Sequence, residues 1–155
     1  MRKMKRFMVG VLALGMALTM TACGGKEQTV TYRGELEESG LKATDTMTFN
    51  AKGDLVQKLE EVIEFDTSSY DDATKDQLNT VYEQLAGQYN DIEGVSCEMT
   101  VGDDNITFHI NVDTTGDAVK NLTEKGLLQM EGGSGKISLK ASTASLESSG
   151  YEKVE

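Results

Sequence analysis

The chain has 155 residues, of which 15 are Lys or Arg and 26 are Asp or Glu, so its formal net charge is −11 at pH 7. An acidic body of this kind is repelled by phosphate groups, so a nucleic-acid partner is not expected. The length fits one domain of ordinary size.

The first 22 residues have the plan of a secretory signal peptide. Residues 1–6 carry four basic side chains, and the sixteen residues that follow carry no charge and end in small side chains. A helix that spans the hydrocarbon core of a bilayer needs about 20 apolar residues. We therefore expect residues 1–22 to be an export signal that is removed, and a permanent transmembrane anchor is the less favoured alternative.

Met20, Thr21 and Ala22 followed by Cys23 resemble the lipobox recognised by the lipoprotein signal peptidase, with Met20 in place of the commoner Leu. The resemblance implies that Cys23 receives a diacylglycerol on its thiol and becomes the first residue of the mature protein. Palmitate or similar acyl chains, two or three in number, attach a protein firmly to a bilayer. We expect a lipoprotein on the extracytoplasmic face of the cell membrane, or at the outer membrane if the host has two membranes.

Removal of residues 1–22 leaves 133 residues and takes away four basic side chains but no acidic one, so the formal net charge becomes −15. Residues 23–28 are then the lipidated cysteine and a short tether, and residues 29–155 are a single domain. We expect the protein to be attached to the membrane through the lipid on Cys23. Cys97 is the second cysteine of the chain, so no disulfide within the chain is expected.

Three strands are expected first, because apolar and polar residues alternate with a period of two. The predicted strands cover residues 29–37, 41–49 and 55–65, with turns at 38–40 and 50–54. The apolar face of the third strand is expected to hold Leu55, Leu59, Ile63 and Phe65. One polar and one apolar face are typical of a sheet with one side in water.

The period changes to three and four over residues 73–90, which predicts an amphipathic helix. Its apolar stripe consists of Leu78, Val81, Tyr82, Leu85 and Tyr89. Residues 95–101 and 106–112 alternate again and predict a hairpin, and short helices are expected at 117–124 and after Ser138 as N-cap. This order predicts an α+β domain, in which the helix at about 73–90 covers one face of a sheet of about five antiparallel strands.

Three groups of residues occur in a characteristic order: 32–35 with 40–41 and 51–54, then 91–95, then 137–140 with 145–151. Together they resemble the YehR-type small lipoproteins, a family described as a domain of unknown function. The resemblance covers residues 29–154. It implies a compact α+β domain on a lipid anchor, and it implies no activity, cofactor or catalytic residue.

Two single residues are candidates for chemistry. His109 is the only histidine, and the alternation places it on the polar face of its strand, so a solvent-facing residue is preferred over a proton sensor or a zinc ligand. Cys97 falls on the apolar face, where a buried and inert thiol is expected. A nucleophilic Cys97 would need an activating neighbour, and His109 is expected to point to the other side of the sheet.

Acidic side chains are the remaining candidates, because a glycosidase needs two carboxylates. The glutamates of the first three strands are expected mostly on polar faces, where they are solvated: Glu35, Glu37, Glu38, Glu60, Glu61 and Glu64. Asp103-Asp104-Asn105 lacks the EF-hand spacing and is expected to be a turn. Residues 132–136 lack the spacing of a phosphate-binding loop and are expected to be a flexible loop.

No catalytic residue, metal ligand or cofactor is therefore predicted, and we do not expect an enzyme. A lipid-anchored, non-catalytic module that binds an envelope protein or a small ligand is preferred. The alternatives are an envelope structural protein and, less favoured, a surface hydrolase that uses carboxylates.

Overall fold

The computed structural model describes residues 25–38, 40–129 and 135–154. The predicted signal peptide, the lipobox with Cys23 and most of the glycine-rich loop at 132–136 lie outside these residues. No helix of the described ranges is long and apolar enough to cross a membrane.

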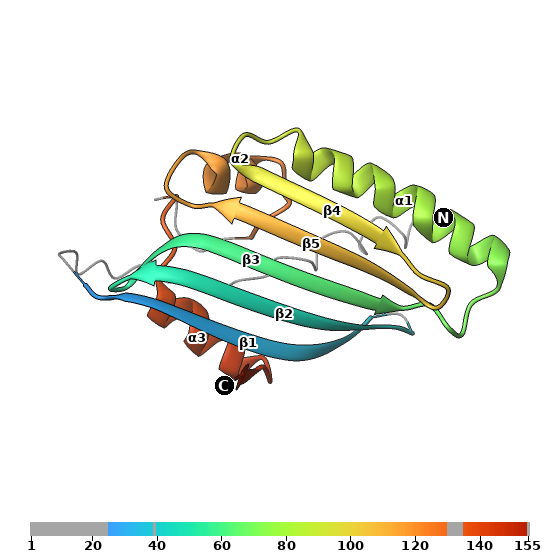
Figure 1. Cartoon of the computed structure of the whole chain (residues 1–155), viewed down its shortest axis with the longest axis horizontal. Coiled ribbons are helices and arrows are strands. Elements are labelled where there is room, and N and C mark those ends of the chain that lie inside the picture. The colour runs from blue at the N-terminus through green and yellow to red at the C-terminus, as the bar shows by residue number, and fades with distance from the viewer. Residues whose placement is uncertain (1–24, 39, 130–134, 155) are drawn as a thin grey trace.

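The centre of the fold is an antiparallel sheet of six strands (Figure 1). In the sheet the strands lie in the order β4, β5, β3, β2, β1, β6. Their bounds are β1 Glu27–Glu38, β2 Leu41–Lys52, β3 Leu55–Asp66, β4 Val95–Val101, β5 Asn105–Asp113 and β6 Glu152–Val154. The first three strands form a meander because their turns are short, and Gly40 and Gly53 supply the positive φ angles that these turns require.

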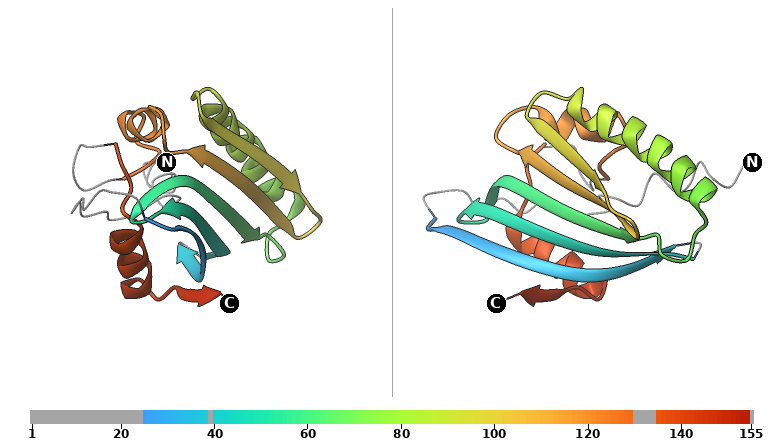
Figure 2. Two further views of the ribbon diagram at one scale, coloured as in Figure 1. Left: turned by 60° about the vertical axis from the view of Figure 1, so that its left-hand side comes forward. Right: turned by 45° about the vertical axis from the view of Figure 1, so that its right-hand side comes forward.

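Three helices lie on one side of this sheet, as Figures 1 and 2 show. They are α1 (Asp72–Asn90), α2 (Ala118–Glu124) and α3 (Leu139–Ser148). The side chain of Asp71 caps α1 by accepting a hydrogen bond from the Thr74 backbone N–H at 2.8 Å. Ser138 caps α3 in the same way, since its hydroxyl accepts from the Ala141 N–H at 3.1 Å. In Figure 1, α1 lies toward the β4 edge and α3 toward the β1 edge.

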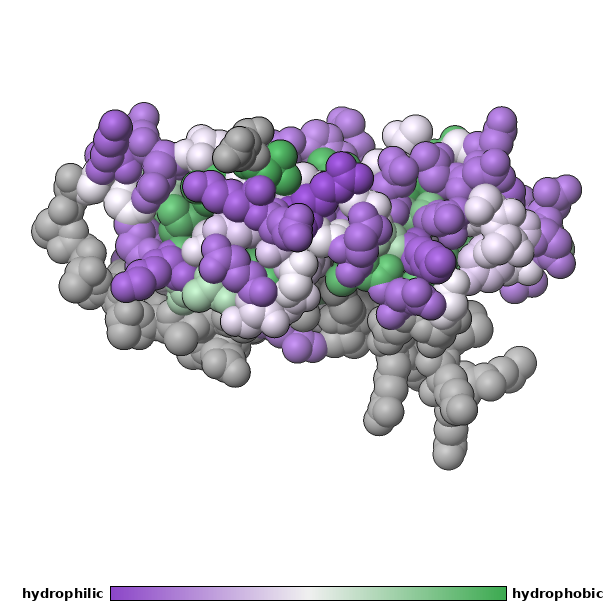
Figure 3. Space-filling model, turned by 90° about the horizontal axis from the view of Figure 1, so that it is seen from below, coloured by the Kyte–Doolittle hydropathy of each residue, from purple (hydrophilic) through white to green (hydrophobic). Residues whose placement is uncertain are grey.

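The alternation of the strands separates a covered face from an open face. The covered face carries the apolar core, in which the rings of Phe65, Phe108 and Tyr82 contact one another with centroids 4.9 to 6.0 Å apart. Because Tyr82 belongs to α1, these contacts attach that helix to β3 and β5. At the other edge, the Tyr32 hydroxyl donates to Glu147 of α3 at 2.7 Å. Polar side chains predominate on the surface shown in Figure 3, and apolar ones form small separate groups.

The predicted α+β class, the long helix at 73–90 and the short C-terminal helices are confirmed. The sheet has a sixth strand, β6, beyond the five expected, and β1 begins at Glu27, two residues before the predicted start of the domain. The placement of Leu55 on the apolar face was wrong. A shift of register between Asn50 and Ala51 puts Val56 inside, at 1 % exposure, and leaves Leu55 38 % exposed.

Candidate functional site

Two acidic side chains lie in the middle of the covered face. Asp45 of β2 is 1 % exposed and Glu61 of β3 is 0 % exposed. Asp45 is paired with Ile63, and Glu61 with Met47, so the two acids are diagonal neighbours on the same face of adjacent strands. Carboxylates are almost never fully buried unless they are paired, so this acid pair is the most unusual feature of the described structure.

The prediction that the glutamates of the strands lie on polar faces was wrong for Glu61. Glu35, Glu37 and Glu64 are exposed, and Glu60 lies on the open face. Glu61 differs because it stands between Leu59 and Ile63, in the apolar phase of β3. Asp45 was not recognised as a candidate at all, although it stands between Ala43 and Met47 in the apolar phase of β2. For both residues, the sequence signal of burial was an acidic residue at a position where the alternation predicts an inward-facing side chain.

Only one carboxyl oxygen of Asp45 accepts a hydrogen bond from a described side chain: the Tyr151 hydroxyl donates to Oδ2 at 2.7 Å. Gly34 makes room for this contact, since a Cβ atom at Gly34 would lie 2.7 Å from the Tyr151 ring. Oδ1 of Asp45 and both carboxyl oxygens of Glu61 are buried and have no hydrogen-bond partner among the described residues. Such unsatisfied buried groups are rare and call for a specific explanation.

Burial changes the acidity of the whole cluster. Desolvation raises the pKa of Asp45 to about 6, although hydrogen bonds from Tyr151 and the Thr46 backbone oppose the change. Desolvation, together with the charge of Asp45, raises the pKa of Glu61 well above its ordinary value. Desolvation likewise raises the pKa of Tyr89 and of Tyr151, and nearby carboxylates add to the effect. The uncharged forms of all four groups are therefore favoured in the absence of a counter-charge.

The acid pair can act as an acceptor site for a positively charged group. In the described part of the chain, no group of three or more His, Cys, Asp or Glu side chains could hold a metal ion. Two tyrosines lie close to the pair: the charge of Glu61 contributes to the raised pKa of both Tyr89 of α1 and Tyr151, which follows α3. Catalytic general acids also have carboxyl groups with raised pKa values in sites without water. Burial of two acids does not by itself assign a catalytic role to this pair.

Cys97 lies on the covered face at 5 % exposure and is a free thiol, as expected from the alternation. Desolvation, together with the charge of Glu61, raises the pKa of this thiol to about 11. The Asn90 side chain bonds both backbone groups of Cys97, at 2.7 and 2.8 Å. A thiol with a raised pKa is a poor nucleophile at neutral pH.

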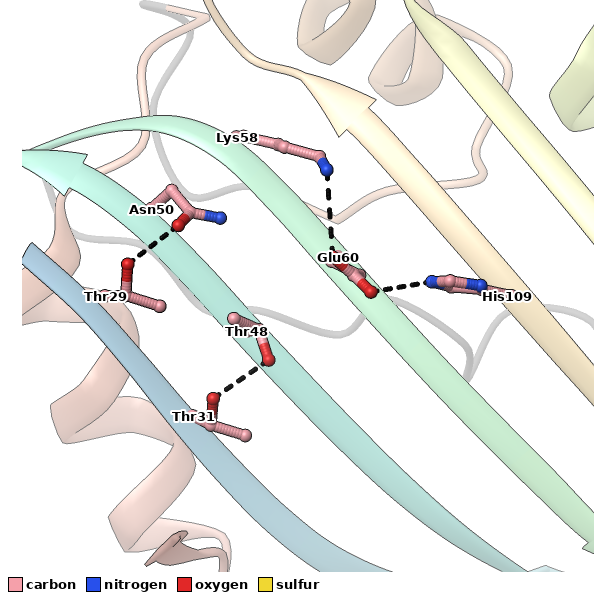
Figure 4. A network of polar contacts seen from close by, with 7 residues as sticks. All are labelled: Thr29, Thr31, Thr48, Asn50, Lys58, Glu60 and His109. Atoms are coloured by element: carbon pink, nitrogen blue, oxygen red, sulfur yellow. Dashed lines mark hydrogen bonds and ion pairs between the residues drawn. The ribbon is translucent and has the colours of Figure 1, made fainter. Parts of the chain in front are cut away.

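His109 lies on the open face, opposite to Cys97, as predicted. It has a partner that the sequence did not reveal, since its Nε2 lies 2.7 Å from Oε1 of Glu60, and Lys58 is 3.7 Å from the same carboxylate (Figure 4). Side-chain hydrogen bonds between β1 and β2 continue this polar surface, including Thr31 with Thr48 at 3.0 Å. Exposed contacts of this kind contribute about 1 kcal/mol or less.

The structure confirms the predicted turn at Asp103 and Asp104, which joins β4 to β5. Lys75 of α1 donates to the Asp103 carbonyl at 2.7 Å and contacts Asp104 at 3.0 Å. The turn therefore helps to hold the first half of α1 against the β4–β5 hairpin.

Comparison with known proteins places this fold in a family. Residues 28–152 match the family described as "Protein of unknown function (DUF1307)". The chain is 27% identical to the uncharacterized lipoprotein Lmo0207 of Listeria monocytogenes, over 99% of both chains. It is also 27% identical to the uncharacterized lipoprotein Lin0239 of Listeria innocua, over 100% of this chain and 99% of the relative.

Two solved structures share the fold. The NMR structure of Escherichia coli YehR matches with a TM-score of 0.64 and 21% identity, over 85% of this chain and 94% of that one. An NMR structure of a Streptococcus pneumoniae protein matches with a TM-score of 0.53 and 13% identity, over 92% and 94%. The resemblance to YehR noted from the sequence is thus confirmed, and the match over residues 28–152 shows that the chain belongs to the DUF1307 family.

Proposed function

We propose that this protein is a lipid-anchored, non-catalytic binding module on the extracytoplasmic face of the membrane, and that it takes a small ligand at the acid pair. The observation that carries the binding role is the burial of three carboxyl oxygens, on Asp45 and Glu61, without a partner among the described residues. A buried polar group without a hydrogen bond costs about 1–3 kcal/mol, and more when it is charged. A ligand that supplies the missing donors removes this cost.

The lipid anchor is supported by the lipobox-like segment that ends at Cys23 and by two relatives described as lipoproteins over nearly their whole length. Cys23→Ala removes the only thiol at the expected attachment point. We expect this variant to lose labelling by radioactive palmitate and to accumulate as unprocessed precursor. Cys97→Ala is the matched control and should be labelled as the wild type is, whereas normal labelling of the Cys23→Ala protein would contradict the proposed anchor.

Binding is tested by native mass spectrometry of the mature protein, extracted from its own host in mild detergent. We expect an additional noncovalent mass on the wild type and its loss from Glu61→Gln, which keeps the shape of the side chain but removes its charge. Glu64→Gln is the matched control, because Glu64 is exposed and lies on the same strand. A wild type with no additional mass, or equal retention by all three proteins, would contradict a ligand from the host held at the acid pair.

A further inference from the structure

We propose that Asp45 and Glu61 together bind a primary ammonium group of the ligand. This inference rests on the proposed function, and it names the chemistry that the acid pair recognises.

The spacing of the two acids suits one small cation. Diagonal neighbours on adjacent strands have Cα atoms about 7–8 Å apart, and the register of β2 and β3 makes Asp45 and Glu61 such neighbours. Two hydrogen bonds of about 2.8 Å from a shared nitrogen bring two carboxyl groups to within about 5–6 Å of each other. A cation between the acids therefore satisfies both of them, whereas no direct hydrogen bond joins them in the structure.

The number of missing donors also matches. Within the acid pair, the unpartnered acceptors are Oδ1 of Asp45 and both carboxyl oxygens of Glu61, which makes three atoms. A primary ammonium group has three N–H donors. The fourth carboxyl oxygen, Oδ2 of Asp45, already accepts from Tyr151. Each carboxyl oxygen of the acid pair then has a donor, and each N–H of the ligand has an acceptor.

The titratable groups near Glu61 lie on β2, α1, β4 and the segment after α3, and none of them is a cation; on β5 the residue paired with Glu61 is Ile110. The titratable groups are Asp45 on β2, Tyr89 on α1, Cys97 on β4 and Tyr151 after α3. Asp45 is the second acid, and the other three side chains are uncharged near neutral pH. Among the described residues, neither Asp45 nor Glu61 forms an ion pair.

Other cations fit these three acceptor oxygens less well. Calcium takes six to eight oxygen ligands, and the described residues provide no cluster of three metal-binding side chains. A guanidinium group has five N–H donors, so two of them would lack an acceptor among the three free oxygens. A quaternary ammonium ion has no N–H donor and leaves all three oxygens unsatisfied.

The inference is tested with ethylammonium chloride as the probe, added to the mature lipidated protein in detergent after dialysis, at constant ionic strength. Binding is followed by NMR at the amide signals of Asp45, Glu61 and Tyr151. Tetramethylammonium chloride and calcium chloride are the comparison cations. We expect saturable shifts with ethylammonium, at least tenfold weaker binding to Glu61→Gln and Asp45→Asn, and unchanged binding to Glu64→Gln.

The pH dependence of ethylammonium affinity distinguishes a binding role of the acid pair from a purely structural one. Binding of the cation stabilises the ionised acids and so releases a proton. The affinity should therefore rise about tenfold per pH unit while one proton is released for each ligand bound. Affinity that is independent of pH from 5 to 8, or equal shifts with tetramethylammonium, would overturn the inference, and saturation by calcium alone would assign the pair to a metal.

Failure of this inference is distinguishable from failure of the proposed function. A native ligand that depends on Glu61 but contains no amine, as shown by its failure to react with an amine-selective reagent, would leave the binding role intact and overturn the ammonium assignment. Ethylammonium binding without any ligand retained from the host would support the assignment and contradict retention of a ligand in the cell.

Discussion

Asp45→Asn tests the energetic consequence of the buried acids. Asn has nearly the shape of Asp, and its carbonyl oxygen still accepts the hydrogen bond that Tyr151 donates to Asp45 at 2.7 Å. The substitution removes the titrating group while the packing of β2 is kept. Any difference in the pH dependence of stability between the two proteins is then due to the carboxyl group.

The size of the effect follows from the pKa of Asp45, which burial raises from 3.8 to about 6. Below a pH of 3.8, Asp45 is protonated in both the folded and the unfolded chain, so its burial does not make the stability depend on pH. As the pH rises toward 6, the unfolded chain ionises while the folded chain stays protonated, and stability falls. A difference of about two pKa units corresponds to about 3 kcal/mol. We therefore expect Asp45→Asn to gain about 3 kcal/mol over the wild type between about pH 3.5 and 6.5.

The assay is equilibrium unfolding in urea, followed by circular dichroism at several pH values in that range. The protein is the mature chain from residue 23 with Cys23→Ser, which carries no lipid. Glu61→Gln should show the same direction of change, because burial raises the pKa of Glu61 too. The stability of Glu64→Gln should change with pH in the same way as that of the wild type. Parallel curves for Asp45→Asn and the wild type would refute the reasoning, because they would mean that Asp45 is solvated in the folded protein.

Three further predictions concern the surroundings of the acid pair. Gly34→Ala should destabilise the protein by about 1–3 kcal/mol in urea unfolding, because the new methyl group must displace the Tyr151 ring; an unchanged midpoint would count against this packing. Cys97 should resist alkylation by iodoacetamide at pH 8 until urea unfolds the protein, since the thiol is buried and its pKa is raised to about 11; rapid labelling of the folded protein would argue otherwise. Ser138→Ala should cost about 1 kcal/mol in the same unfolding assay, because it removes the N-cap of α3, and a loss of Ser138 without effect would disprove that role.

Local patterns were sufficient to predict most of the fold. The period-two alternation located the five long strands and their two faces, and the period of three to four located α1, because both patterns depend on burial of one side of a single element. The short strand β6 was missed since Glu152–Val154 are all exposed and show no apolar alternation. The change of register beside Asn50 was missed because it depends on how β2 and β3 pair.

The acid pair required information that a strand pattern does not contain. Asp45 and Glu61 each stand at a position where the alternation of the strand predicts an inward-facing apolar residue, and this was visible in the sequence. A single acid at such a position does not reveal whether its side chain is buried or the alternation is interrupted. Their proximity depends on the register between β2 and β3. The Tyr151 contact joins residues 106 positions apart, and no local rule predicts it. In contrast, the inward orientation of Cys97 and the outward orientation of His109 followed from alternation alone.

The most direct test of the binding site is the titration of the Glu61 carboxyl carbon by ¹³C NMR in the mature protein, with and without saturating ethylammonium. Without the cation, we predict that Glu61 stays protonated well above its ordinary pKa of 4.5, because it is buried beside Asp45. With the cation, we predict that its pKa falls, because the ammonium group stabilises the carboxylate. A Glu61 that titrates near its ordinary pKa in both samples would contradict a buried acid site, and a raised pKa that ethylammonium leaves unchanged would contradict the ammonium assignment.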